Sequence, residues 1–237
     1  MGYFLKAFIL YLLFVFMLII GIDDAGRGPV IGPMVLAGVL IDKSVEKDLI
    51  KLGIKDSKML SPKKREQLAR EIEERAIATH RVVISVDEID NQKTDGLNLN
   101  QREAIAAAMI INKLNDGKEN INVVIDCPSV NLEAWKDEVD KYLVAKANIH
   151  LVCEHKADAN HIIVGAASIL AKVRRDCEVK KIRERIGVDF GSGYPSDPVT
   201  RKFIYEHYKE FEGKGIFRES WSTIKKHKAH GIQKKLF

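Results

Sequence analysis

The feature that most constrains this chain is a pair of adjacent aspartates, here called the doubled acid, at the end of an apolar run. Residues 18–22 are apolar and predict a buried strand, and Asp23 and Asp24 follow it directly. Because neighbouring side chains on a strand point to opposite faces, both carboxylates share one site only where the strand ends. The small-residue turn at residues 25–28 predicts that end. A polar hairpin tip between two core strands would explain the stretch equally well.

The turn itself carries groups that suit a ligand. Gly26 and Gly28 allow backbone amides to approach a bound molecule closely. Arg27, between them, is a residue type that recognises phosphate. The turn is therefore a candidate binding element beside the doubled acid.

Two further acids stand at the ends of expected elements. Asp126 follows a short β-branched run at residues 122–125, and Asp158 comes just before a helix. Alone, each would be a turn residue or a helix cap. Together with Asp23 and Asp24 they form the oxygen-rich set that hard divalent cations prefer. The chain has no zinc-type His/Cys cluster, no Gly-rich phosphate loop and no nucleophile turn, so the set indicates metal-dependent phosphoryl chemistry.

Strands that alternate with helices predict an α/β domain. Gly32, Pro33 and Gly38 interrupt the second strand and favour bends or an exposed edge there. After Gly187 the chain becomes rich in turns, which indicates a smaller helical lobe. The expected strands are 18–22, 30–42, 80–86, 122–125 and 149–153. The expected helices are 63–78, 98–114, 132–143, 161–186, 199–211 and 221–227. Ser61 as N-cap and Pro62 at the first helical position predict where the first of these helices begins.

The length and charge of this chain predict one hydrophobic core and a basic C-terminal segment. At 237 residues and 46% hydrophobic content it can bury one substantial core. Residues 225–237 hold five lysines and no acid, which equals the whole formal net charge of +5. This basic tail is a solvated extension or an added attraction for phosphate.

The first residues are unusually apolar, without interruption from residue 7 to residue 20. Such a run resembles a signal peptide or a membrane anchor. However, residues 18–22 are needed as a core strand, and the dozen or so that remain are too short to span a bilayer. We therefore expect residues 1–16 to be an artefact of the chosen start codon, with no stable membrane association. Cys127, Cys153 and Cys177 show no ligand spacing, which indicates reduced thiols in the cytoplasm.

Residues 21–29 resemble the first signature of ribonuclease HII (type 2 ribonuclease H), archaeal-like, which reads Gly-x-Asp-Glu-Ala-Gly-Arg-Gly-Pro. Eight of the nine positions match, and Asp24 replaces the family's Glu. Further blocks resemble the family in the family's order, over roughly residues 17–221. They are Asp56-Ser57-Lys58-Met59-Leu60, the helix segment at 165–176 with its Ala-Ala-Ser-Ile-Leu-Ala-Lys-Val core, and the loop at 191–197 that contains Tyr194.

The resemblance implies a ribonuclease H-like mixed sheet flanked by helices at residues 17–190, with a helical lobe and basic tail at 191–237. It implies an endonuclease that hydrolyses the RNA strand of RNA–DNA hybrids and single ribonucleotides embedded in duplex DNA. The products would carry a 3′-hydroxyl and a 5′-phosphate. Two Mg²⁺ or Mn²⁺ ions would be held by Asp23, Asp24, Asp126 and Asp158. Asp24 is one methylene shorter than Glu, so it ligates from a closer strand end or through a water.

The resemblance also implies how substrate is recognised. The backbone of Gly26, Arg27 and Gly28, together with the ring of Tyr194, would recognise the 2′-hydroxyl that distinguishes RNA from DNA. Tyr194 could instead be a loop aromatic that packs on the core, and Lys172 and Arg174 could lie on a solvated helix face. The candidate phosphate contacts are Lys58, Ser168, Lys172 and Arg174.

Two rival functions stay open at this point. One is another nuclease, resolvase or transposase of ribonuclease H-like architecture, which would leave the Gly-Arg-Gly turn and the Tyr194 loop unexplained. The other is a catalytically weak hybrid-binding or membrane-tethered protein with a degenerate site. Asp24 and the apolar N-terminus are the features that favour this second rival.

The last five residues resemble, in part, a peptide that binds the DNA sliding clamp. Gln233 and Leu236 keep the three-residue spacing of one helical turn. Phe237 follows Leu236 directly, without the two intervening residues of the motif. A frayed basic tail is the alternative. Apart from this clamp contact, we expect a monomer.

Overall fold

The computed structural model describes residues 17–54 and 60–233. The expectations for residues 1–16, Lys58, Leu236 and Phe237 fall outside these residues. Within the described part of the chain, no helix combines the length and the apolar character that crossing a membrane requires.

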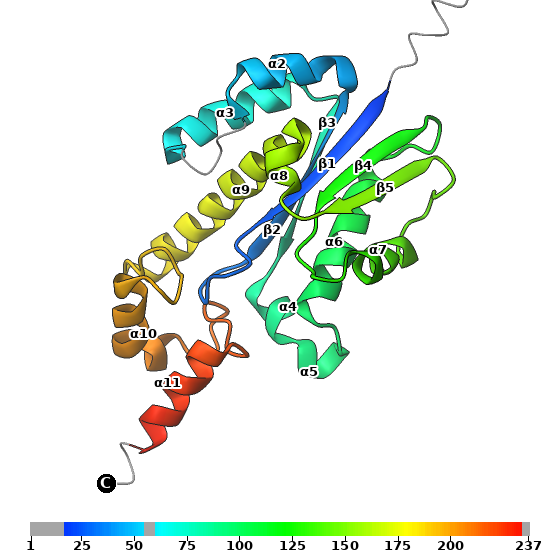
Figure 1. The fold of residues 1–237 in the computed structure, drawn as a ribbon. Helices are drawn as coiled ribbons and strands as arrows, with labels where there is room; N and C mark the ends of the chain where they lie inside the picture. Colours follow the sequence, from blue (N-terminus) through cyan, green and yellow to red (C-terminus); the bar gives the residue numbers. More distant parts are fainter. Residues whose placement is uncertain (1–16, 55–59, 234–237) are drawn as a thin grey trace, which may run out of the picture.

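A five-stranded mixed sheet forms the centre of the molecule (Figure 1), as expected. Its order is β3-β2-β1-β4-β5. β1 pairs with β2 and β2 with β3 in antiparallel register, whereas β1, β4 and β5 run parallel. The strands are β1 (Leu18–Ala25), β2 (Met34–Asp42), β3 (Ala78–Ile84), β4 (Ile121–Asp126) and β5 (Ile149–Glu154).

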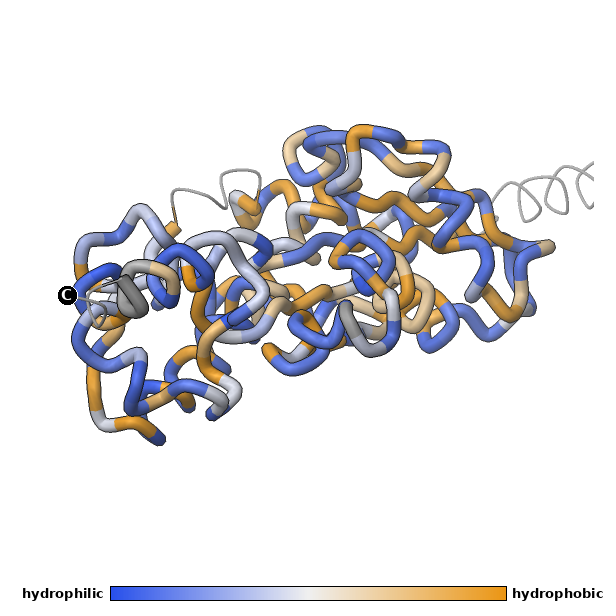
Figure 2. The backbone as a smooth tube through the Cα atoms, turned by 90° about the horizontal axis from the view of Figure 1, so that it is seen from below, coloured by the Kyte–Doolittle hydropathy of each residue, from blue (hydrophilic) through white to orange (hydrophobic). Residues whose placement is uncertain are grey.

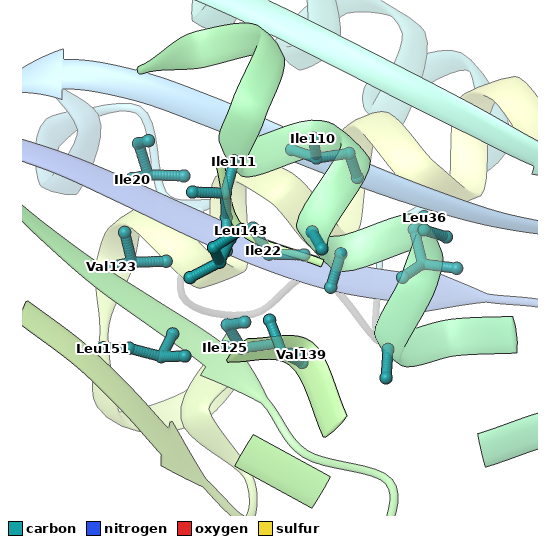
Figure 3. Packing of buried hydrophobic residues seen from close by; sticks show 14 of the residues in the cluster. Ile20, Ile22, Leu36, Ile110, Ile111, Val123, Ile125, Val139, Leu143 and Leu151 are labelled. Carbon is teal, nitrogen blue, oxygen red and sulfur yellow. The ribbon is translucent and has the colours of Figure 1, made fainter. Parts of the chain in front are cut away.

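Helices cover both faces of this sheet. α6 (Leu99–Leu114) and α7 (Leu132–Lys141) bury one apolar cluster against it, which Figure 3 shows around Ile22, Ile110 and Val123. α9 (Ile162–Ile186) and α3 (Pro62–Arg75) bury a second cluster on the opposite face. The other helices are η1 (Lys43–Val45), α2 (Glu46–Lys51), α4 (Val86–Asp90), α5 (Gln92–Asp95), α8 (Ala157–Asn160), α10 (Pro198–Phe211) and α11 (Ser222–Gln233).

Each expected helix is present, with boundaries shifted by three residues or fewer, except that α11 ends at Gln233 instead of residue 227. Ser61 caps α3 as predicted, since its hydroxyl accepts a hydrogen bond from the Lys64 amide at 3.3 Å, and Pro62 is the first helical residue. The helices that the sequence did not predict have six residues or fewer, too few to show a helical period.

The expectation of an exposed edge for the second strand is wrong. β2 lies between β1 and β3, and its residues are buried except Asp42. Gly32 and Pro33 precede the strand. Gly38 lies inside it because an added Cβ would stand 2.2 Å from Cγ2 of Ile110, so the glycine lets α6 pack closely on the sheet.

The first strand also runs further than expected. β1 pairs with β2 through Ala25, so Asp23 and Asp24 are strand residues. By alternation Asp23 lies on the α9 face with Gly21, and Asp24 lies on the α6 face with Ile22. The two carboxylates are therefore near the strand end but on opposite sides of it.

The C-terminal lobe (residues 191 onward) packs at one end of an elongated molecule, far from the start of β1 (Figure 1). Polar and apolar residues are interspersed along it (Figure 2), as in helices with one buried face. Its aromatic core also contains residues of α9 and of the β1–β2 loop (residues 26–33), including Val30 and Ile31. The lobe is therefore joined to the sheet through this loop.

Gly21 is the position at which we predict the largest cost of a single methyl group. An added Cβ would lie 2.6 Å from the backbone carbonyl atoms of Ile163 in α9. Gly21→Ala should lower the free energy of unfolding by about 2–3 kcal/mol, since backbone moves aside less readily than a side chain. Gly53→Ala is the control, because its Cβ would meet nothing and only its φ of +77° opposes it. Urea unfolding measures both, and equal costs would contradict the close approach.

Candidate functional site

Three of the predicted acids come together at the ends of two parallel strands. The pairing of β1 with β4 ends at Ile22 and Ile125, so Asp23 and Asp126 are the next residues on neighbouring strands. Burial raises the pKa of Asp23 well above its usual value, and the charges of Asp24 and Asp126 raise it further. Burial also raises the pKa of Asp24 to about 6, an effect that Arg27 opposes. We call Asp23, Asp24 and Asp126 the acid cluster.

Nearby donors hold the members of the acid cluster in place. The Ser168 hydroxyl on α9 bonds Asp23, whose Oδ1 also accepts the Asp24 amide at 2.7 Å. Lys172 Nζ in turn donates to Ser168 Oγ at 2.8 Å. Asp126 Oδ1 accepts the amide of Ala157, at the start of α8, at 2.9 Å. The carboxylate of Asp23 is thus oriented by α9 and its own strand, and that of Asp126 by the start of α8.

Asp158 comes near the acid cluster through its backbone but lines a different cavity. It follows Ala157 on α8, whose amide bonds Asp126. Asp158 is one of the residues that line a broad cavity of about 750 Å³, with His150 and His161, beside β1, β4 and β5. The small cavity that all members of the acid cluster line does not include it. The structure therefore brings the Asp158 helix to the site, but not the Asp158 carboxylate into that cavity.

Sequence reasoning missed a buried carboxylate on the α6 side of β1. Glu103 on α6 is 1% exposed, forms an ion pair with Arg27, and lines the same small cavity as the acid cluster. Burial raises its pKa to about 7, which the hydrogen bond from Arg27 opposes. Arg27 also donates to Asn100 Oδ1 at 2.7 Å. The sequence could have revealed Glu103 through its helical spacing, since it lies on the buried face of α6 with Ala106, Ala107 and Ile110.

A second cavity, of about 250 Å³, adjoins the acid cluster and shares Asp24 with it. The 26–28 turn forms one wall. The Tyr194 ring, 40% exposed, faces Gly28, where an added Cβ would lie 3.1 Å from Cε1 of the ring. The predicted residues that the structure brings together here are Gly26, Arg27, Gly28, Lys172 and Tyr194, and Ser168 is linked to them through Lys172. We call this the turn cavity.

The arginine of α9 that lines the turn cavity is Arg175, next to the predicted Arg174. Arg174 forms an ion pair with Glu178 at 3.0 Å. Arg175 lies over the Tyr194 ring, 5.8 Å from the ring centroid, and donates to the Ser192 carbonyl at 3.1 Å. Spacing along α9 could have found it, since positions 168, 172 and 175 lie on one helical face and 174 does not.

Arg218 also escaped sequence reasoning, because nothing in the residues around it marks a site. Its side chain is fully buried and donates to the backbone carbonyls of Gly26, Arg27 and Gly32. Burial lowers its pKa to about 10, and the neighbouring charge of Arg175 acts in the same direction. The residue links the C-terminal lobe to the turn cavity.

The acid cluster suits a hard divalent cation by its chemistry. Its donors are oxygens only, and the repulsion that raises the pKa of Asp23 would be relieved by a cation. Among residues 17–54 and 60–233, no three His, Cys, Asp or Glu side chains stand ready to hold a metal ion by themselves. Mg²⁺ in phosphoryl-transfer sites usually takes one or two carboxylates and completes its shell with water and substrate phosphate. The cluster fits that kind of ion.

The raised pKa of Asp24 predicts how stability changes with pH in metal-free buffer. Between about pH 4 and 6 the folded chain keeps a proton on Asp24 that the unfolded chain has lost. The free energy of unfolding should therefore fall as pH rises through this window. Asp24→Asn should raise it at pH 8 by about 1–2 kcal/mol relative to the parent, with little change at pH 4. Urea unfolding at both pH values measures this, and a parallel offset at the two would contradict it.

Comparison with known proteins agrees with the geometry. The family model described as ribonuclease HII matches residues 20–224. A ribonuclease HII of Methanococcus maripaludis (strain C6) is 45% identical over 212 residues, covering 88% of this chain and 86% of its own length.

Solved structures show the same fold. The ribonuclease H2 of Pyrococcus horikoshii OT3 superimposes with a TM-score of 0.80 at 35% identity, covering 90% of this chain and 98% of its own. The structure of a PCNA:RNase HII complex from Archaeoglobus fulgidus gives a TM-score of 0.76 at 37% identity, covering 87% and 96%. Two strand-end carboxylates, a glycine turn and this shared architecture lead to one assignment: the chain belongs to the ribonuclease HII family of metal-dependent endonucleases, and its activity is that of a ribonuclease H.

Proposed function

We propose that the enzyme hydrolyses the RNA strand of RNA–DNA hybrids and cuts on the 5′ side of single ribonucleotides in duplex DNA, leaving a 3′-hydroxyl and a 5′-phosphate. The observation that carries this proposal is that Asp24 belongs to both the acid cluster and the turn cavity. A phosphodiester at the acids would place its sugar beside the 26–28 turn and Tyr194. Cleavage and ribose recognition would then act on the same nucleotide.

Asp23, Asp24, Asp126 and Asp158 are the residues that would hold two divalent ions, Mg²⁺ or Mn²⁺. Bound there, such ions would supply an activated water and stabilise the departing 3′ oxygen. The chain contributes orientation: Ser168 and the Ala157 amide fix the carboxylates of Asp23 and Asp126. Asp24 would ligate directly or through a water, because its side chain is short.

Cationic side chains on α9 would receive the phosphate next to the scissile bond. Lys172 lowers the pKa of Asp24 by its charge, so it lies close enough to offset a phosphate at the acids. Arg175 lies on the same face of α9 and lines the same cavity. The amides of the 26–28 turn would bond the 2′-hydroxyl, and the Tyr194 ring would stack on the sugar. Lys58 remains a candidate phosphate contact on the sequence resemblance. The resemblance also assigns Arg174, and the experiment below compares it with Arg175.

Asp126→Asn tests the metal-dependent cleavage. Loss of one charged ligand should lower the rate on a duplex with one embedded ribonucleotide on the order of 10³-fold or more, at saturating Mg²⁺. Asp116→Asn, an exposed acid in the loop between α6 and β4, is the matched control and should cut like the parent. Near-normal turnover by Asp126→Asn would remove this residue from the site. Tight binding by the parent without any cleavage would support the binding-only alternative.

Arg175→Ala and Arg174→Ala separate the two neighbouring arginines. Arg175→Ala should weaken binding of the ribonucleotide duplex about tenfold and lower the salt slope of log K by about one. Arg174→Ala should change neither by much, because its guanidinium pairs with Glu178. Fluorescence anisotropy between 50 and 200 mM salt measures both. A larger effect of Arg174→Ala than of Arg175→Ala would restore Arg174 as the phosphate contact that the sequence resemblance implies.

We further propose that the C-terminal residues bind the DNA sliding clamp through Gln233, Leu236 and Phe237. Gln233 is the last residue of α11, and a related ribonuclease HII is known in complex with PCNA. Clamp tethering would raise the local concentration of the enzyme on newly copied DNA. The three cysteines are unpaired, which suits a reducing compartment, and we place the enzyme in the cytoplasm.

Paired tail variants test the clamp contact. Leu236→Ala with Phe237→Ala should weaken clamp binding at least tenfold, because apolar anchors of this kind supply most of the binding energy. Lys234→Ala with Lys235→Ala is the control that removes charge and keeps the anchors. Calorimetric titration of clamp into each full-length variant measures the affinities. Loss of binding in the lysine variant, with parental affinity in the Leu236 and Phe237 variant, would assign the contact to charge alone.

A further inference from the structure

The largest fully buried side chain in the described part of the molecule belongs to Arg218, in the segment between α10 and α11. Its guanidinium donates three hydrogen bonds, all to carbonyls of the β1–β2 loop. Nε reaches the Gly32 carbonyl at 3.0 Å, and the two terminal nitrogens reach the carbonyls of Arg27 at 3.0 Å and Gly26 at 2.6 Å. The planar guanidinium of an arginine presents several N–H donors at fixed angles, and so it can bond these three carbonyls at once.

The backbone around Arg218 fixes the same loop from the same side. The Arg218 amide donates to the Val30 carbonyl at 2.9 Å, and the Gly32 amide donates to the Ile216 carbonyl at 3.0 Å. The Val30 amide donates to the Gly193 carbonyl at 2.8 Å, on the segment that carries Tyr194. None of these bonds uses the amides of Arg27 or Gly28.

The direction of those two amides follows from peptide geometry. In a planar trans peptide the carbonyl and the next N–H point in opposite directions. With the Gly26 and Arg27 carbonyls turned toward Arg218, the amides of Arg27 and Gly28 point away from it. Residues 26–28 line the turn cavity and Arg218 does not, from which we infer that the cavity lies on the amide side of the loop.

We propose that Arg218 is a positioning residue that sets ribose specificity, by holding the 26–28 turn so that its amides face the 2′-hydroxyl of the substrate. This inference rests on the proposed function. The guanidinium charge on the carbonyl side also polarises both peptides and makes their N–H groups stronger donors. Substrate and Arg218 would therefore bond opposite sides of the same two peptides.

Arg218→Lys keeps the positive charge and removes the planar guanidinium, so it tests whether the three hydrogen bonds to the loop carbonyls set the ribose specificity. Arg183→Lys is the matched control: Arg183 also bonds a backbone carbonyl of the C-terminal lobe, that of Gly191, and lies over an aromatic ring, 5.1 Å from the centroid of Phe190. Both are made in full-length Asp126→Asn protein, so that the duplex stays uncut. The measured quantity is the ratio of two Kd values, for an all-DNA duplex and for the same duplex with one ribonucleotide.

The expected result is that Arg218→Lys lowers this ratio about tenfold, with the all-DNA Kd unchanged within about twofold. Arg183→Lys should keep the parental ratio. A parental ratio in folded Arg218→Lys, or equal weakening on both duplexes, would overturn the inference and leave Arg218 as a structural link only. If Asp126→Asn itself shows no preference for the ribonucleotide, the proposed function fails and this inference fails with it.

Asp90→Asn provides a second test of the role of Arg218 if Arg218→Lys does not fold. Asp90 at the end of α4 accepts the amides of Glu219 and Ser220, at 2.6 and 3.0 Å, and so anchors the segment that carries Arg218. Asn has one acceptor oxygen in place of two, so the segment loosens while Arg218 stays. The ratio should then fall several-fold, and an unchanged ratio would overturn the inference.

Discussion

Burying a guanidinium costs several kcal/mol unless its donors are bonded, and Arg218 meets that condition where the C-terminal lobe joins the sheet. Three loop carbonyls accept its hydrogen bonds, and the Trp221 ring lies 4.9 Å from its central carbon. Loss of the side chain would leave those carbonyls unbonded inside the protein. The loop that carries Arg27 is therefore only as well ordered as its contact with residues almost two hundred positions later in the chain.

The charges around this loop have opposite signs. The acid cluster concentrates negative charge that burial makes costly, and the pKa of Asp23 rises as a result. The positive charges of Arg27, Lys172 and Arg218 lower the pKa of Asp24. The folded protein thus keeps repulsion among carboxylates that cations can relieve. Such a site reduces stability in the absence of its ligand and gains it on binding, as expected for a functional site.

Two glycines in the sheet let helices reach the acids from both faces. Gly21 in β1 faces the backbone of α9, and Gly38 in β2 faces Ile110 of α6. Close approach of α9 places Ser168 beside Asp23, while α6 places Glu103 beside Arg27. Asp23 and Asp24 lie on opposite sides of β1, so the two carboxylates face different helices. In the function proposed above, they would act as one site because both helices pack close to the strand.

The sequence by itself determined the features that depend on near neighbours: the strand-end position of Asp126, the capped start of α3, the glycine turn and the long helices, because helical and strand periods are local. Only the tertiary structure decided the central place of β2, the separate cavity of Asp158, and the parts played by Glu103, Arg175 and Arg218. These depend on contacts between distant segments; Arg218 and Gly26 are 192 positions apart. Local periodicity carries no information about which strand lies between which others, or about which buried charge meets which carbonyl.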